Sequence, residues 1–367
     1  VLGMGYTYGQ ALVVVFISGV FFIVITAIGL REAIIRSIPD AVKTAITPGI
    51  GLFITIIGLK NAGIVISNPA TLVSLVDFSQ WKIEGADLAL MSSALVALAG
   101  LVIMGMLHAR KVKGSILLGI VAATLIGIPL GVTHISNLDM NIGMKFRDFA
   151  EVSFMKMDFA GLFSGANMVE TIFTVTMLVI SFSLVNMFDS IGTLLGAAKQ
   201  SGMIDENGEV IRMKQALMSD AISTAAGAMV GTSTVTTVVE SSAGIAAGGR
   251  TGLTSLVTAL MFLGAILFAP IVSIVPAAAT APALIFVGIL MLGNIRDVDF
   301  SDMSNALPAF CTIVFMPFTY SIANGVAFGL ITYCLMKLTT GRRQDVKILT
   351  LAISVVFVVR YAFMTLG

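Results

Sequence analysis

Two carboxylates in strongly apolar surroundings are the residues of this sequence best suited to bind a ligand. Asp189 stands in VNMFDSIGTLLG (185–196), and Glu240 stands in GTSTVTTVVESSAGIAAGGRTG (231–252). An ionisable side chain at the centre of a membrane helix costs ~2.5–3.5 kcal/mol on insertion scales, so such residues usually face a cavity or a partner. The sequence therefore predicts a polar binding site around Asp189 and Glu240.

Asp189 belongs to a polar stripe on a predicted helix. Asn186, Asp189 and Thr193 have the spacing i, i+3 and i+7, which places them on one helix face. Contacts between membrane helices usually use Ser, Thr or Asn, whereas a carboxylate favours the lining of a binding site. We interpret the stripe as a site lining, with a helix–helix contact as the alternative.

The stretch around Glu240 combines β-branched residues with glycines. TVTTVV (234–239) disfavours a helix and predicts a short extended piece, and ESSAGIAAGG is predicted to form a half-helix beginning near Ser241. At membrane depth, unpaired backbone groups are tolerated only where protein or a water-filled cavity surrounds them. The free amides of the half-helix and Glu240 could therefore clamp a small polar ligand. A glycine-rich loop outside the membrane is the alternative.

Three other ionisable residues in apolar segments are interpreted as structural. Lys60 and Arg360 lie near the ends of their predicted spans, where a long side chain can reach the interface. Asp220 lies near the start of its predicted helix, where it would face a basic loop or the helix dipole.

The composition places the chain in a lipid bilayer. Of 367 residues, 57% are hydrophobic and 11% are charged, and the mean hydropathy is +1.02. Soluble domains carry about 25% charged residues. The net charge of +1 argues against a nucleic-acid partner. The sequence has no histidine or cysteine pattern with metal-ligand spacing and no nucleophile–base pair, so we expect neither a cofactor nor an enzyme.

Apolar windows predict an all-α polytopic membrane protein, since lipid tolerates only helices or closed barrels and the alternation of a barrel is absent. A bilayer core of ~30 Å needs ~20 apolar residues per helix. The windows are 10–30, 44–67, 87–107, 114–132, 170–198, 212–231, 253–275, 278–293, 305–319, 321–338 and 347–366.

Basic clusters predict which loops are cytoplasmic, because positive charge accumulates on that side. The clusters are Arg31/Arg36/Lys43, Arg110/Lys111/Lys113, Lys199/Arg212/Lys214 and Arg342/Arg343/Lys347. The intervening segments 68–86 and 133–169 are then predicted to face outward. Blocks 25–49 and 288–313 both run from an apolar span through a glycine, an Arg/acid pair and an X-Pro step. This similarity suggests two related halves, and an ordinary membrane helix–loop–helix is the alternative.

Several motifs together resemble the nucleobase–cation symporters of the xanthine/uracil permease type, in particular the azaguanine-type purine permeases. They include FDSIGTLLG (188–196), GTSTVTTVVESSAGIAAGGRTGLT (231–254) and ISGVFFIVITAIGLREAIIRSIP (17–39). The resemblance implies two inverted seven-segment repeats forming a core and a gate domain, with short strand and half-helix elements at mid-membrane.

The resemblance also implies a division of the chain. It opens just beyond the family's third segment, so its first segments are expected to be missing through N-terminal truncation. Residues 1–132 would be the remainder of the first inverted repeat, 133–169 an extramembrane linker, and 170–367 the second inverted repeat with the substrate-site segments.

The implied function is import of purine nucleobases (adenine, guanine or hypoxanthine) with protons across the cytoplasmic membrane, and a homodimer is compatible with it. By match, Asp189 and Glu240 are the family's carboxylates of the eighth and tenth segments and would carry the coupling proton, while Val239 would offer a backbone amide. The expected substrate-binding residues are Asp189, Glu240, Val239, Asn186, Ser241 and Thr193.

One departure and one rival accompany this resemblance. The azaguanine-type permeases commonly read D-x-F-D where this chain has Asn186-Met187-Phe188-Asp189, and loss of the first carboxylate could alter purine preference or coupling. The rival is an anion exchanger of the same architecture. It is disfavoured because Glu240 and Asp189 would repel an anion.

Overall fold

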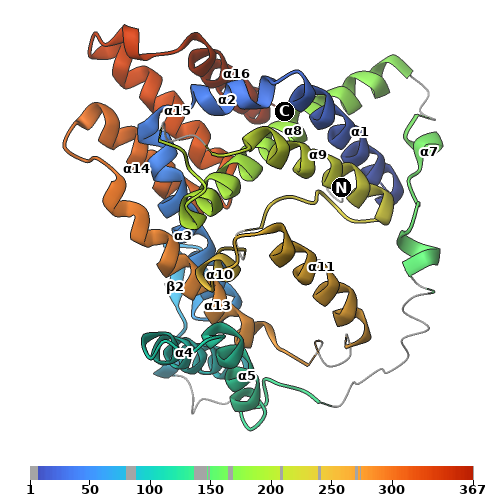
Figure 1. Ribbon diagram of the computed structural model, residues 1–367, viewed down its shortest axis with the longest axis vertical. Helices are drawn as coiled ribbons and strands as arrows, with labels where there is room; N and C mark the ends of the chain where they lie inside the picture. Colours follow the sequence, from blue (N-terminus) through green and yellow to red (C-terminus); the bar gives the residue numbers. More distant parts are fainter. Residues whose placement is uncertain are drawn as a thin grey trace. The chain divides into compact units, whose positions relative to one another are not determined.

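The computed structural model describes residues 7–79, 88–135, 147, 149–163, 168–206, 210–238, 241–268, 272 and 274–366. Most of them are helical, and every predicted apolar window contains a helix (Figure 1). In the described part of the chain, five helices are long and apolar enough to cross a membrane. The helices are α1 (Tyr8–Ala27), α2 (Leu30–Ser37), α3 (Asp40–Asn61), α4 (Leu88–Ala109), α5 (Ser115–Gly127), η3 (Phe149–Ser153), α7 (Phe159–Phe163), α8 (Met168–Ser201), α9 (Met213–Val230), α10 (Ser241–Ala246), α11 (Gly252–Leu267), α13 (Ala277–Leu292), η4 (Gly293–Asp297), α14 (Met303–Phe318), α15 (Ile322–Thr339), η5 (Arg343–Asp345) and α16 (Ile348–Leu366).

Several helix ends follow directly from the local sequence. Thr7 and Gln10 form a capping box at the start of α1, in which each side chain accepts a hydrogen bond from the other residue's backbone N–H. Gly29 precedes α2 with φ 78°, and Gly231 ends α9 with φ 92°. Glycine adopts these left-handed angles at no steric cost, so the chain can turn sharply at both places.

The span predicted at 44–67 has different bounds in the structure. Helix α3 begins at Asp40 and ends at Asn61, and a β-hairpin follows it. Strand β1 (Val65–Asn68) pairs antiparallel with β2 (Leu72–Leu75). The Asn68 side chain accepts hydrogen bonds from the backbone N–H groups of Ala70 and Thr71, which fixes the turn.

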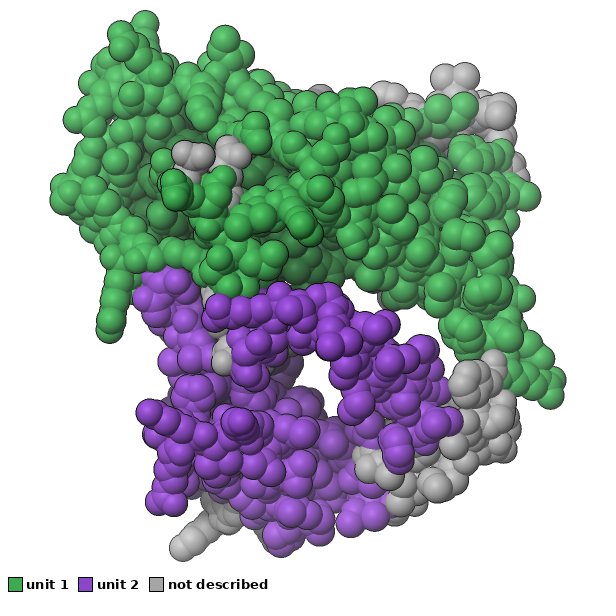
Figure 2. All heavy atoms as spheres, viewed as in Figure 1, with its two compact units in different colours: residues 1–47, 143–239, 295–367 green, residues 48–142, 240–294 purple. Residues whose placement is uncertain are grey.

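The chain forms two compact units, and neither is continuous in sequence. Unit 1 comprises residues 1–47, 143–239 and 295–367, and unit 2 comprises 48–142 and 240–294 (Figure 2). Each unit therefore draws on both predicted halves, 1–132 and 170–367. The inverted-repeat relation stays a prediction: the similar blocks differ locally, since the first contains the α-helix α2 and the second the 3-10 helix η4.

Within unit 1, α1 and α9 pack closely along their length. A Cβ atom built on Gly19 would lie 2.6 Å from the backbone nitrogen of Ala225, so only glycine permits this approach. Helix α8 joins the pair through Ser18 and Ser183, whose buried hydroxyls are 2.8 Å apart. Helices α1, α8 and α9 thus form one packed group that carries the polar residues described below.

Replacing Gly19 with Ala should force α1 and α9 apart and destabilise the protein by about 1–3 kcal/mol, the usual cost of overpacking. The measurement is the thermal unfolding midpoint of the purified protein in detergent. Gly105→Ala in α4 is the matched control, because no atom lies within 4 Å of its added Cβ. Equal midpoints for the two variants would contradict the close approach.

The α14–α15 hairpin of unit 1 is fixed at one end by a carboxylate. Asp302 accepts hydrogen bonds from the backbone N–H of Ser304 (2.9 Å), from its hydroxyl (2.9 Å) and from Nη1 of Arg342 (2.7 Å). These bonds, led by the one from the Ser304 N–H, lower the pKa of Asp302 to about 2. Asp302 is therefore ionised throughout the physiological pH range and contributes no titration there.

Unit 2 has its own small apolar core. One buried cluster combines residues that follow α3 or flank the two strands with residues of α4 and α13: Ala62, Ile64, Val76, Met91, Ala94, Ala97 and Ala281. Small residues dominate this cluster, as they do wherever membrane helices approach closely.

Candidate functional site

The predicted polar stripe lies on α8, a continuous helix of 34 residues. Asn186 and Thr193 are both buried, and Asp189 lies between them in the helix at the expected spacing. The Thr193 hydroxyl donates to the backbone oxygen of Ser190 (3.1 Å). The structure thus brings three of the predicted site residues onto one helix, within about two turns.

Asn186 offers an unsatisfied donor. In the part of the chain that the structure describes, its buried Nδ2 has no hydrogen-bond partner. A buried polar group without a partner costs about 1–3 kcal/mol, so native proteins rarely keep one without a reason. A bound ligand with an acceptor atom would satisfy this amide.

The residue after Asp189 anchors the neighbouring irregular segment. The Ser190 hydroxyl donates to Oδ1 of Asp220 in α9 (3.0 Å) and lies 2.7 Å from Oγ1 of Thr236. Ser190 has a single hydroxyl hydrogen, and the carboxylate accepts it, so Thr236 must donate to Ser190. A second bond runs from the Thr224 hydroxyl to the backbone oxygen of Val235 (3.0 Å). Segment 232–238 is therefore tied to both α8 and α9.

Asp220 also forms a buried ion pair. Its Oδ2 lies 2.8 Å from Nη2 of Arg31, and the two side chains are 2% and 0% exposed. Nη1 of Arg31 donates to the backbone oxygen of Leu217 (3.1 Å), and the guanidinium lies 4.7 Å from the ring centroid of Phe22. We expected Asp220 near the start of its helix, facing a basic loop or the helix dipole; it lies instead inside α9, which begins at Met213, and its partner is the buried Arg31.

Arg31 requires a correction to the sequence analysis. We placed it in a basic loop cluster with Arg36 and Lys43, but it is fully buried in α2 and paired. It is followed by Glu32 and lies in a short helix that also contains Arg36, so nothing local signals burial. The signal is Asp220 itself, a carboxylate that needs a cation in an apolar environment.

The glycine-rich stretch contains the predicted half-helix. Residues 232–238 are irregular, without an assigned strand, and α10 begins at Ser241 and ends at Ala246. Ser241 is exposed at the first position of α10. Val239 and Glu240 lie outside the described residues. The half-helix is confirmed, and the roles of Val239, Glu240 and Ser241 stay predictions.

Comparison with known proteins identifies the family. The model of the family described as the Permease family (Xan_ur_permease) matches residues 1–328. The chain belongs to this family. The protein is therefore a permease, a multi-pass protein of the cell membrane and not an enzyme.

Several curated relatives match nearly the whole permease chain. A putative permease of Methanocaldococcus jannaschii is 40% identical over 355 residues, which cover 97% of this chain and 76% of the relative. Adenine permease AdeP of Escherichia coli is 38% identical (99% of this chain, 76% of the relative), and guanine/hypoxanthine permease PbuO of Bacillus subtilis is 37% identical (97% and 78%). The matched regions thus span about three quarters of the length of these relatives.

Proposed function

We propose that this permease imports purine nucleobases, and that α8 supplies part of the binding site. The observation that carries the proposal is the similarity to adenine and guanine/hypoxanthine permeases over nearly the whole chain. The unsatisfied amide of Asn186 beside Asp189 supports it, because a purine offers ring nitrogens and carbonyls as acceptors.

The proposed site matches the chemistry of a purine base. A purine is flat and neutral, and its edges carry both donors and acceptors. Asp189 and Glu240 would accept N–H donors, Asn186 and the backbone amide of Val239 would donate, and Thr193 and Ser241 would complete the site. An unmatched buried partner costs about 1–3 kcal/mol, so this set would select strongly among bases.

We also propose that the coupling ion is a proton held by Asp189 or Glu240. A desolvated carboxylate has a raised pKa, which suits a group that takes up and releases a proton near neutral pH. The core and gate domains that the resemblance implies would then move against each other to expose the site alternately to the two sides. Dimer formation and the two-repeat division stay predictions.

Uptake measurements test both parts of the proposal. Cells that lack their own purine permeases should take up labelled adenine, guanine or hypoxanthine when they express this chain, and unlabelled bases should compete. A proton uncoupler should abolish this uptake. Uptake that is unchanged by the uncoupler would contradict proton coupling but not the proposed substrate. Absence of base uptake, with sulfate uptake instead, would favour the anion exchanger.

A further inference from the structure

A basic pocket lies within unit 1, and none of the predicted substrate-binding residues is among its lining residues. It is formed by α2, the first turn of α3, the end of α8 and the start of α9, and its volume is about 220 Å³. A water molecule occupies about 30 Å³ of liquid, so the pocket can hold a phosphate group together with a small polar substituent. The lining residues include Glu32, Arg36, Lys43, Lys214 and Gln215.

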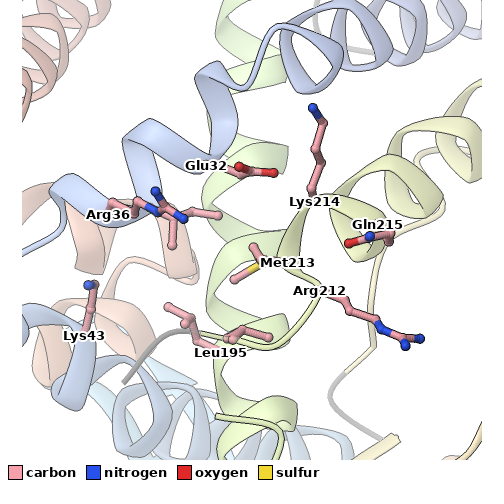
Figure 3. A pocket seen from close by; sticks show the side chains of 10 residues that line it. Glu32, Arg36, Lys43, Leu195, Arg212, Met213, Lys214 and Gln215 are labelled. Atoms are coloured by element: carbon pink, nitrogen blue, oxygen red, sulfur yellow. The ribbon is translucent and has the colours of Figure 1, made fainter. Parts of the chain in front are cut away.

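Two cations and one carboxylate define the chemistry of this pocket. Arg36 and Lys43 stand on one side with Glu32 near them, whereas the ammonium of Lys214 and the guanidinium of Arg212 both extend away (Figure 3). Oε1 of Glu32 is buried and, among the described residues, has no hydrogen-bond partner. The pocket therefore suits an anionic group that also carries a hydrogen-bond donor.

The pocket lies at the level where membrane helices end. Lys214 in the first turn of α9 donates to the backbone oxygen of Ala27, the last residue of α1. The pocket is thus at the end of the α1–α9 pair that carries the basic residues, which the sequence assigns to the cytoplasmic side. Basic pockets between membrane helices on this side bind phosphate-bearing lipid headgroups.

We propose that this pocket binds a phosphate group, supplied by the headgroup of an anionic phospholipid such as phosphatidylglycerol or by free phosphate. Arg36 and Lys43 neutralise the phosphate, and Glu32 accepts a hydrogen bond from a headgroup hydroxyl or from a protonated phosphate. The two sources share the same phosphate chemistry.

Occupancy of the pocket would stabilise the packing of α2. Arg31, the residue before Glu32, makes the buried ion pair with Asp220. A ligand held by Glu32 and Arg36 on α2 and by Lys43 on α3 therefore fixes the helix that carries this ion pair. This inference concerns binding and does not depend on the transported substrate.

The test is the thermal unfolding midpoint of the full chain in detergent, with and without added ligand. Dioleoylphosphatidylglycerol should raise the midpoint by about 2–4 °C when it is well above its dissociation constant, whereas dioleoylphosphatidylcholine should not. In Arg36→Gln/Lys43→Gln the shift should disappear. In the control Arg110→Gln/Lys113→Gln, which removes two exposed basic residues of another loop, it should persist.

Inorganic phosphate serves as the second probe. A shift with phosphatidylglycerol but not with phosphate would support a lipid source, and a shift with both would support the phosphate site with a soluble source as well. The proposal would be overturned if neither probe shifted the midpoint. It would also be overturned if the Arg36→Gln/Lys43→Gln variant responded as the wild type does.

Discussion

Asp189→Asn and Glu240→Gln should each lower the initial rate of purine uptake by roughly 10- to 100-fold. A hydrogen bond to a charged group contributes about 1.5–3 kcal/mol, and its loss in a desolvated site corresponds to that range of rates. Neither amide can take up a proton, so residual uptake should also lose its response to an uncoupler in the variant that removes the proton-binding carboxylate. The measurement is uptake of labelled adenine and guanine at matched expression in the membrane.

Glu206→Gln is the matched control for these variants. Glu206 is an exposed carboxylate in the turn between α8 and α9, and its replacement should leave uptake unchanged. Uptake near the wild-type rate in Asp189→Asn would remove Asp189 from the proposed site, and the corresponding result for Glu240→Gln would remove Glu240. Uptake of no base by the wild type would instead overturn the proposed substrate.

Asp220→Asn should destabilise the protein by about 3–5 kcal/mol, because it leaves the guanidinium of Arg31 buried without a counter-charge. The Ser190 hydroxyl would also lose its charged acceptor beside Asp189, so uptake should fall together with stability. The measurement is the unfolding midpoint in detergent. The exposed pair Arg147–Glu151 provides the control, and Glu151→Gln should cost less than about 1 kcal/mol.

A double variant separates charge from packing in this prediction. Arg31→Gln/Asp220→Asn removes both charges but keeps two groups that can hydrogen-bond, so it should be more stable than Asp220→Asn alone. Two results would contradict this contribution of the buried pair to stability. One is a double variant that is less stable than Asp220→Asn, and the other is an equal unfolding midpoint for Asp220→Asn and Glu151→Gln.

Much of the helical architecture could be predicted from the sequence because apolar length specifies a membrane helix almost by itself. The polar stripe of α8 and the start of α10 at Ser241 were also predictable, since each depends only on local spacing or on β-branched residues. The hairpin after α3 was missed because Val and Ile give the same apolar signal in a short strand as in a helix.

The buried network could not be predicted for a different reason. Arg31 and Asp220 are 189 residues apart, and the bond exists only once α2, α8 and α9 have packed. Arg31 shares a short amphipathic helix with Glu32 and Arg36, and such a sequence is typical of a helix at the membrane surface. The division into two compact units could not be predicted from the sequence either, because each unit combines segments from distant parts of the chain.

The distance between Arg31 and Asp220 also has a consequence for biogenesis. At about 5–20 residues per second, Asp220 leaves the ribosome about 10–40 s after Arg31. Burial of an unpaired guanidinium in hydrocarbon is unfavourable, so α2 should stay at the bilayer surface during that interval, after α1 has inserted. Burial of α2 is then a late step, which is completed only when α9 has inserted and Asp220 can pair with Arg31. Ribosome-bound chains that end before Asp220 should therefore leave a cysteine introduced at Glu32 open to water-soluble maleimides.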